Sequence, residues 1–170
     1  GMLEATGWID DTWYTEESCE RGQVVHRLTA DYDLGACDVA RCVSRYRNYL
    51  LAHATAMSIL RPEIVEVETP QVHAQLRYGG RPDRLWRLTG MGAVGELKSA
   101  APARSHQVQT ALQAILAAPT FNIPPGLVRR FALYLQDGGR FKLEEHRDRR
   151  DFDEAHRVIR HCTSGVSRYA

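Results

Sequence analysis

Residues 79–100 read GGRPDRLWRLTGMGAVGELKSA and contain two runs of strand-forming residues on either side of a glycine-rich break. The first run is Arg81–Leu88, the second is Ala93–Ser99, and Gly90-Met91-Gly92 separates them. Short runs rich in apolar residues, joined across glycines, predict an antiparallel β-hairpin. This hairpin would form the middle of a sheet and determine the fold around it.

Three charged side chains of this hairpin are spaced so that they can converge. Residues two apart in a strand point to the same face, so Glu96 and Lys98 share one face. The hairpin brings Asp83 alongside, but the glycines allow more than one register and leave its exact partner open. Two carboxylates held together raise each other's pKa unless a cation lies between them. A divalent ion such as Mg²⁺ suits this place, with Asp83, Glu96 and the backbone carbonyl of Leu97 as oxygen ligands.

Such an arrangement of two carboxylates, a metal ion and a lysine meets the chemical requirements of phosphodiester hydrolysis. A bound metal ion polarises a phosphoryl oxygen and lowers the pKa of a bound water. Lys98 would orient the attacking water or stabilise the charge that develops on phosphorus. The simpler interpretation is an exposed Glu96–Lys98 pair on a half-buried strand. That pair alone is common, and it is the addition of Asp83 that favours a catalytic site.

The composition is that of one globular domain over residues 1–170. The chain has 44% hydrophobic and 25% charged residues and a net charge of +1. We interpret Gly1, which precedes Met2, as the remnant of a cleaved tag. The sequence contains neither an apolar run long enough to cross a membrane nor a secretion leader, which predicts a cytoplasmic protein without membrane partners. The four cysteines form no CxxC pair, so we expect no zinc or iron–sulfur site.

The order of predicted elements indicates one central mixed β-sheet flanked by helices, an α/β (α+β) fold. Capping and periodicity predict helices from Thr15 to about Tyr32, over 39–60, over 105–118 and from a capping box at Asp151 and Glu154. Besides the hairpin above, we expect a strand over 64–68 paired with 74–78, a loop over 119–126, and a hairpin of 127–135 with 140–145.

Four short motifs resemble the PD-(D/E)XK nuclease superfamily, in its RecB-like branch, which includes lambda-type phage exonucleases and CRISPR-associated RecB-like exonucleases. The resemblance covers about residues 21–117 and implies a restriction-endonuclease-like core. The motifs, in chain order, are RGQVVH (21–26), GGRPD (79–83), GELKS (95–99) and HQVQTA (106–111).

This resemblance implies a role for each matching residue. Asp83 and Glu96 would hold Mg²⁺ or Mn²⁺, with His26 as a further ligand. Lys98 would be the catalytic lysine, and Gln109 would position it or contact DNA. The implied protein is a metal-dependent DNA nuclease, an exonuclease acting in DNA processing or recombination of the phage type. Its specificity would come from DNA ends or single-stranded tails, or from a homo-oligomer that encircles the strand.

The sequence departs from the family pattern at Gln113, where the family's QxxxY motif has tyrosine. The chain also lacks the cysteine cluster of the iron–sulfur members. Residues that could contact nucleic acid are Arg81, Arg84, Arg104 and Gln113, although arginines at the rim of a sheet also serve as solubilising groups.

Two further questions remain open at the level of sequence. Glu66 and Glu68 share a strand face and either lend the metal an outer carboxylate or occupy an exposed strand edge.

The alternative to a nuclease is a catalytically inactive domain of this fold that binds nucleic acid or a protein partner. A third possibility is a metal-dependent hydrolase that acts on nucleotides rather than on polymers.

Overall fold

The central sheet has five strands in the order β1-β4-β5-β6-β7. The β5 and β6 strands are parallel, and the other neighbouring pairs are antiparallel. The predicted mixed sheet flanked by helices is therefore confirmed. The strands are β1 (Glu63–Val67), β4 (Arg84–Leu88), β5 (Met91–Lys98), β6 (Arg129–Leu135) and β7 (Phe141–Glu145).

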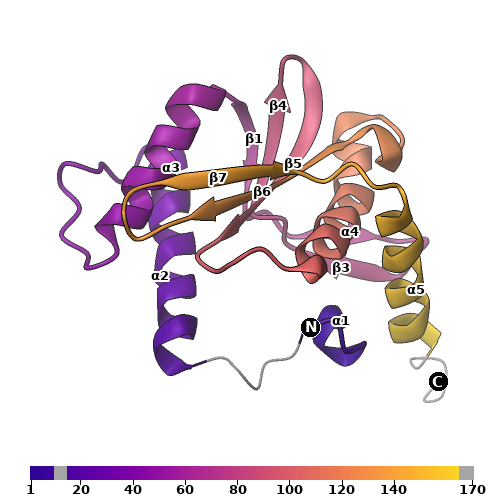
Figure 1. Cartoon of the computed structure of the whole chain (residues 1–170). Coiled ribbons are helices and arrows are strands. Elements are labelled where there is room, and N and C mark those ends of the chain that lie inside the picture. The colour runs from indigo at the N-terminus through magenta and orange to yellow at the C-terminus, as the bar shows by residue number, and fades with distance from the viewer. Residues whose placement is uncertain (10–14, 165–170) are drawn as a thin grey trace.

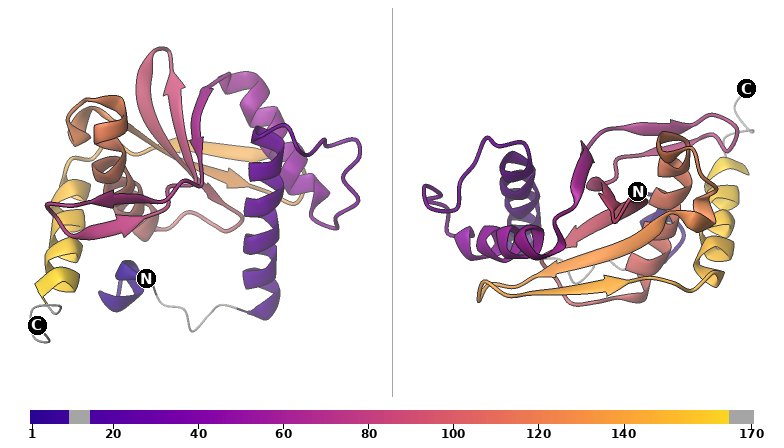
Figure 2. Two further views of the ribbon diagram at one scale, coloured as in Figure 1. Left: turned by 180° about the vertical axis from the view of Figure 1, so that it is seen from behind. Right: turned by 90° about the horizontal axis from the view of Figure 1, so that it is seen from above.

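Helices cover both sides of this sheet in the computed structural model, which describes residues 1–9 and 15–164. Helices α2 and α3 lie on one side of the sheet, and α4 and α5 lie on the other (Figures 1 and 2). Within the described ranges, no helix is both long enough and apolar enough to cross a membrane. The helices are α1 (Met2–Ala5), α2 (Glu16–Asp33), α3 (Arg47–Leu60), α4 (Arg104–Phe121), α5 (Arg150–Ser164) and a short 3₁₀ helix, Pro125–Leu127.

Alternation along β5 decides which of its side chains face which helical layer. Leu97 is buried in a cluster that includes Ala52 of α3. Val94 is buried in a cluster that includes Ala114 of α4. Because successive side chains of a strand point to opposite faces, Glu96 and Lys98 share the face of Val94 and point toward α4.

The turn of the β4–β5 hairpin differs from the expected one. Leu88 pairs with Met91, so Thr89 and Gly90 are the two turn residues, with φ of 52° and 81°. Positive φ at both positions defines a type I′ turn, whose twist matches that of the strands. The break therefore lies at Thr89-Gly90 rather than at Gly90-Met91-Gly92, and β5 begins at Met91 rather than at Ala93.

Gly95 is required by the packing of the neighbouring strand. A Cβ atom at this position would lie 2.3 Å from the ring of Trp86, far inside van der Waals contact. The absence of a side chain at Gly95 therefore allows the indole of Trp86 to be completely buried against the sheet.

The predicted strand over 64–68 exists as β1, but its predicted partner was wrong. It pairs with β4, and Ile64 and Val65 pack against the two cores on opposite sides of the sheet. A separate hairpin with 74–78 would leave one of these cores uncovered. Instead, β2 (Gln71–His73) and β3 (Tyr78–Gly80) form a two-stranded sheet of their own, joined by a turn.

The predicted start was right for α2 and wrong for α3. The start of α2 is as predicted, with reciprocal hydrogen bonds between Thr15 and Ser18. By contrast, α3 begins at Arg47 and not at residue 39. In the preceding segment the side chains of Asp38 and Ser44 accept hydrogen bonds from nearby backbone N–H groups, at 2.8 and 3.1 Å. Such local bonds compete with helix formation.

Helix α4 continues beyond the point where a loop was expected. It passes through Pro119 to Phe121 and ends at Asn122, whose φ of 54° is left-handed. The backbone N–H of Asn122 bonds to the carbonyl of Ala118 and closes the last turn. Pro119 removes one backbone donor within that turn, but the cap at Asn122 supplies a defined end to the helix.

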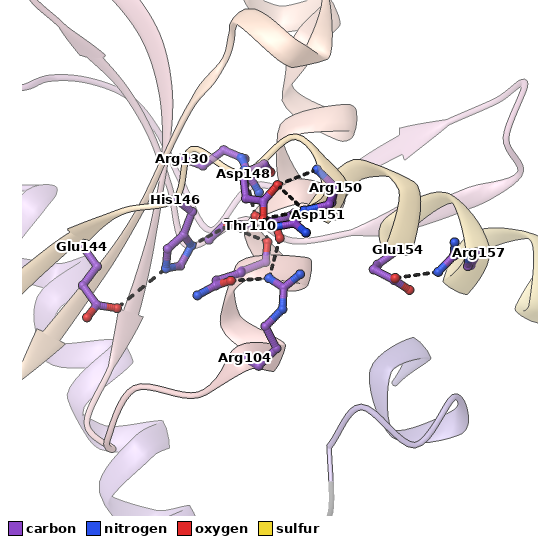
Figure 3. A network of polar contacts seen from close by, with 11 residues as sticks. Arg104, Thr110, Arg130, Glu144, His146, Asp148, Arg150, Asp151, Glu154 and Arg157 are labelled. Carbon is purple, nitrogen blue, oxygen red and sulfur yellow. Dashed lines mark hydrogen bonds and ion pairs between the residues drawn. The ribbon is translucent and has the colours of Figure 1, made fainter.

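Helix α5 is held by buried ion pairs rather than by the predicted capping box (Figure 3). Asp151 is fully buried and accepts hydrogen bonds from the guanidinium groups of Arg104 on α4 and Arg130 on β6. Asp148 instead receives the backbone N–H of Arg150 at the start of the helix. The expectation that Asp151 caps the helix with Glu154 was wrong, because its carboxylate points into the protein.

Candidate active site

Asp83 lies directly before β4, and its carboxylate links β5 to α2. Its Oδ2 accepts a hydrogen bond of 2.8 Å from the backbone N–H of Leu97, and its Oδ1 lies 3.3 Å from Nδ1 of His26. Burial alone would raise the pKa of Asp83, but the neighbouring His26 and Lys98 lower it below the usual value. Asp83 is therefore an ionised carboxylate held in a fixed orientation.

Glu96 is almost completely buried, and donors surround its carboxylate. Its Oε1 accepts hydrogen bonds from Nζ of Lys98 and from Nε2 of Gln109, both at 2.6 Å. Its Oε2 accepts a hydrogen bond from Nε2 of Gln113. Burial and the nearby charge of Asp83 raise the pKa of Glu96, despite the opposing effect of Lys98. The two carboxyl groups therefore differ: the pKa of Asp83 is lowered and the pKa of Glu96 is raised.

Gln109 joins the lysine to this carboxylate. Nζ of Lys98 donates to Oε1 of Gln109 at 2.9 Å, while the amide of Gln109 donates to Glu96. The three side chains form a closed set of hydrogen bonds between β5 and α4. The ammonium group of Lys98 is thereby held in one position at the base of the site.

His26, Glu68 and Asp83 form a group in which one ligand atom of each lies within 4.8 Å of the others. Oε1 of Glu68 is buried and, among the described residues, has no hydrogen-bond partner; it lies 3.7 Å from Nδ1 of His26. A buried carboxylate oxygen without a hydrogen-bond donor calls for a partner such as an ordered water or an ion. The two carboxylates of this group are ligands that suit Mg²⁺ and Mn²⁺, whereas an imidazole nitrogen is a more usual ligand of transition metals and favours Mn²⁺ of the two.

The charge of His26 depends on this acidic surrounding. Burial lowers its pKa, but Asp83 and Glu96 outweigh that effect and raise the pKa to about 9. In the metal-free chain at neutral pH, the imidazole is therefore protonated and offsets the negative charge of the site. A metal ion at this position would have to displace that proton, because only the neutral ring is a ligand.

Glu68 is the residue of this group whose place the sequence left open, between an outer carboxylate for the metal and an exposed strand edge. Glu66 turns away and accepts a hydrogen bond from Gln71 at 2.9 Å, whereas the backbone N–H of Glu68 bonds to the carbonyl of Asp83 at 3.0 Å. Glu68 also has a left-handed φ of 47°, so the chain turns at the end of β1. Only the pairing of β1 with β4 brings this carboxylate to the site, and no local pattern signals that pairing.

Arg84, one of the predicted nucleic-acid contacts, is completely buried. Its Nε bonds to the carboxylate of Asp33 on α2, and its Nη1 donates to the carbonyl of Asp83 at 2.6 Å. The other oxygen of Asp33 is hydrogen-bonded to Nε2 of His53 at 2.8 Å. Arg84 is thus an internal cation that joins α2, α3 and β4, and the expectation that it contacts nucleic acid is corrected.

The remaining predicted residues have different surroundings. The side chain of Arg81 is 63% exposed and lies 3.5 Å from Oε2 of Glu68, at the rim of the site. Arg104 is bound to Asp151 and Gln107 at the start of α4. The side chain of Gln113 is buried and is hydrogen-bonded to Glu96. For Leu97, the structure shows its N–H bound to Asp83, and ligation through its carbonyl stays a prediction.

A cleft of about 640 Å³ lies between α2 and the edge of the sheet. It is lined by His26, Glu68, Asp83, Glu96 and Gln109. Gly22 and His26 lie on its helical wall, and no atom lies within 4 Å of the Cβ position at Gly22, so the missing side chain leaves open space. The cations Arg27 and Arg81 line the same cleft as the acidic groups. The geometry therefore combines a negatively charged floor with a partly basic rim.

Comparison with known proteins supports the fold. The structure is similar to the crystal structure of "Putative exonuclease" from Eubacterium rectale, with a TM-score of 0.59 and 11% sequence identity, covering 99% of this chain and 72% of that one. No family model matches the chain. No curated protein matches it either. The similarity shows that the two chains share a fold, and the assignment of a function depends on the site.

Proposed function

We propose that this chain is a Mg²⁺- or Mn²⁺-dependent nuclease that hydrolyses phosphodiester bonds at DNA ends or single-stranded tails. One observation carries the proposal. The ammonium of Lys98 is hydrogen-bonded to Glu96 and Gln109. These two residues line one cleft together with the acidic group of His26, Glu68 and Asp83. The structural similarity to an exonuclease-like fold supports the same class of reaction.

The residues divide into two sets with different tasks. His26, Glu68 and Asp83 would hold the metal, with Glu96 adjoining them. When bound, the metal would supply Lewis-acid stabilisation of the phosphate and of a nucleophilic water. Lys98 would direct a hydrogen bond to the attacking water or to a non-bridging phosphate oxygen as negative charge builds up.

Hydrolysis of the phosphodiester requires that a water oxygen bond to phosphorus while the bond to the leaving alkoxide oxygen breaks. The water loses one proton, and the leaving alkoxide gains one. Burial and the charge of Asp83 raise the pKa of Glu96, so its carboxylate is a better proton acceptor than an ordinary glutamate and would take the proton of the water. Solvent water would protonate the leaving alkoxide. Gln109 would hold the side chains of Lys98 and Glu96 in place during this transfer, because it is hydrogen-bonded to both.

The test uses the two lysines of the chain, Lys98 and Lys142. Lys142 lies on β7 and is bonded to Glu144, with its side chain 56% exposed. On end-labelled linear DNA with Mg²⁺ or Mn²⁺, we expect Lys98→Ala to lose about 100-fold or more in rate, in line with the loss of a charge-stabilising group. Lys142→Ala should cleave like wild type.

Equal cleavage by wild type and Lys98→Ala would overturn the proposal. Binding of DNA without any cleavage, and without Mn²⁺ binding, would identify the inactive nuclease-fold domain instead. Cleavage of a small phosphodiester such as bis(4-nitrophenyl) phosphate, with none of DNA, would identify a nucleotide-directed hydrolase.

A further inference from the structure

Two of the four cysteines, Cys37 and Cys42, lie on either side of one tight turn in the segment between α2 and α3. The backbone N–H of Arg41 donates to the carbonyl of Asp38 at 3.2 Å and closes this turn. Oδ1 of Asp38 also accepts the backbone N–H of Ala40, at 2.8 Å. Because Cys37 directly precedes the turn and Cys42 directly follows it, the turn brings the two cysteines back toward each other.

Hydrogen bonds tie this turn to the helices on both sides. Before it, the backbone N–H groups of Ala36 and Cys37 donate to the carbonyl of Asp31 on α2, at 2.7 and 3.1 Å. Within it, the carbonyl of Val39 accepts a 2.8 Å hydrogen bond from Nε of Arg47, the first residue of α3. The folded chain therefore holds the two cysteines in a defined arrangement.

The two thiols lie side by side. Burial raises the pKa of Cys37, and the neighbouring thiol of Cys42, which is within hydrogen-bonding reach, raises it further. Sγ of Cys37 also lies 3.9 Å from the carbonyl of Asp38, to which it is a weak donor. Both cysteines are free and half-buried, so a small reagent in solution can reach them.

This arrangement is close to that of a disulfide. Residues directly opposite each other on antiparallel segments have Cβ atoms about 4.5–5.5 Å apart. A disulfide joins Cβ atoms that are roughly 3.5–4.5 Å apart. The two ranges adjoin, and the segment that carries both thiols belongs to neither a helix nor a strand. A bond between the two sulfurs therefore requires only a small local shift.

We propose that Cys37 and Cys42 are a site of reversible oxidation, at which a small-molecule disulfide such as oxidised glutathione converts the two thiols into one disulfide. The thiolate of one cysteine attacks a sulfur of the oxidant, breaks its S–S bond and releases one glutathione. The thiolate of the other cysteine then attacks the protein sulfur of the mixed disulfide and releases the second glutathione. The protein sulfurs lose two electrons to the glutathione sulfurs, and the two thiol protons end on the released glutathione.

This oxidation site is independent of the proposed nuclease function, although it adjoins the wall of the cleft. Leu34, three residues before Cys37, lines the cleft. The disulfide would close the segment that leads from this wall to α3. In reducing compartments, disulfides that form transiently are typical of catalytic or redox-sensing sites.

Trypsin gives a direct readout, because it cleaves after Arg41, between the two cysteines. The chain is incubated with oxidised glutathione, the remaining thiols are blocked with iodoacetamide, and the digest is analysed by mass spectrometry without reduction. We expect peptides 28–41 and 42–45 to be joined by a disulfide. Cys19 on α2 and Cys162 on α5 should carry glutathione or the alkyl group instead.

Serine variants separate the pair from its individual members. In Cys42→Ser, Cys37 should keep bound glutathione, because no second thiol is present to release it. Cys19→Ser is the matched control and should still give the joined peptides. Separate glutathione adducts on Cys37 and Cys42 in the folded wild-type chain would overturn the proposal, as would unmodified Cys37 and Cys42 beside a glutathione adduct on Cys19.

A comparison in denaturing urea tests whether the folded turn, rather than the short spacing along the chain, brings the thiols together. We expect the ratio of joined peptides to glutathione adducts to fall at least about tenfold on unfolding, because the turn no longer orients the sulfurs. An equal ratio in the folded and unfolded chain would show that the fold builds no such site.

Discussion

The backbone N–H of Leu97 donates a 2.8 Å hydrogen bond to Oδ2 of Asp83, so the strand that carries Glu96 also orients the other acid of the site. This bond occupies one oxygen of Asp83 and leaves Oδ1 directed toward His26. The carboxylates and the imidazole of this group are therefore already in place in the metal-free chain. Preorganisation of this kind lowers the cost of binding, because no side chain has to be ordered by the ligand.

The first prediction concerns metal affinity. Titration calorimetry with Mn²⁺ should show binding to wild type and no detectable binding to Asp83→Asn. Glu68→Gln should weaken binding at least about tenfold, because it removes the charge of a buried ligand oxygen. The matched control is Glu66→Gln, two residues earlier on the same segment, whose carboxylate is bonded to Gln71. A Glu68→Gln variant that binds Mn²⁺ as wild type does would remove Glu68 from the ligand set.

The second prediction concerns pH and the metal-free chain. Because the folded pKa of His26 is raised to about 9 from 6.5, the protonated ring stabilises the fold fully below pH 6.5. This contribution is lost as the pH rises through 9. Urea unfolding in EDTA should therefore show a fall in the free energy of unfolding over this range, and His26→Gln should reduce that fall. His161→Gln, at an exposed position on α5, is the control.

The third prediction concerns the buried cation Arg84. Replacing it with methionine leaves the carboxylate of Asp33 buried with His53 as its remaining partner, and we expect a loss of about 3–5 kcal/mol in urea unfolding. Arg87→Met, on the same strand, removes a partly exposed pair with Glu63 and should cost about 0–1 kcal/mol. Similar losses for both variants would contradict the structural role assigned to Arg84.

The fourth prediction concerns the attachment of α5. Asp151→Asn leaves Arg130 as a buried cation without its counter-charge and should lower the free energy of unfolding by about 3–5 kcal/mol. Asp148→Asn, three residues earlier and only partly buried, should have a much smaller effect. Thermal unfolding of the two variants side by side is the measurement. If both were equally mild, the ion pairs in Figure 3 would not hold the helix.

Local patterns predicted those parts of the fold that depend on local chemistry. Thr15 and Ser18 form the predicted start of α2 because both partners of the cap lie within one turn. The shared face of Glu96 and Lys98 follows from strand periodicity alone. The observed register pairs Arg84 with Gly95, which brings Asp83 to the end of β4 beside Glu96 and resolves the choice that the sequence left open.

Features that depend on pairing across long separations were not predictable. Glu68 reaches the site only because β1 joins β4, and the expected partner of β1 was a nearer segment. Arg84 appears on sequence to be one of several arginines around the hairpin, and its buried partner Asp33 lies 51 residues away. No periodicity in either segment indicates that these two charges meet.

The guanidinium of Arg84 also has a mechanical consequence. It is bonded to Asp33 and Thr29 on α2 and to the carbonyl of Asp83, so it ties this helix to the start of the strand beside the catalytic acid. Moving α2 away from β4 would require the buried ion pair between Arg84 and Asp33 to break. A change in the width of the cleft that leaves this ion pair intact therefore has to come from residues outside the contact between α2 and β4, such as the exposed side chain of Arg81.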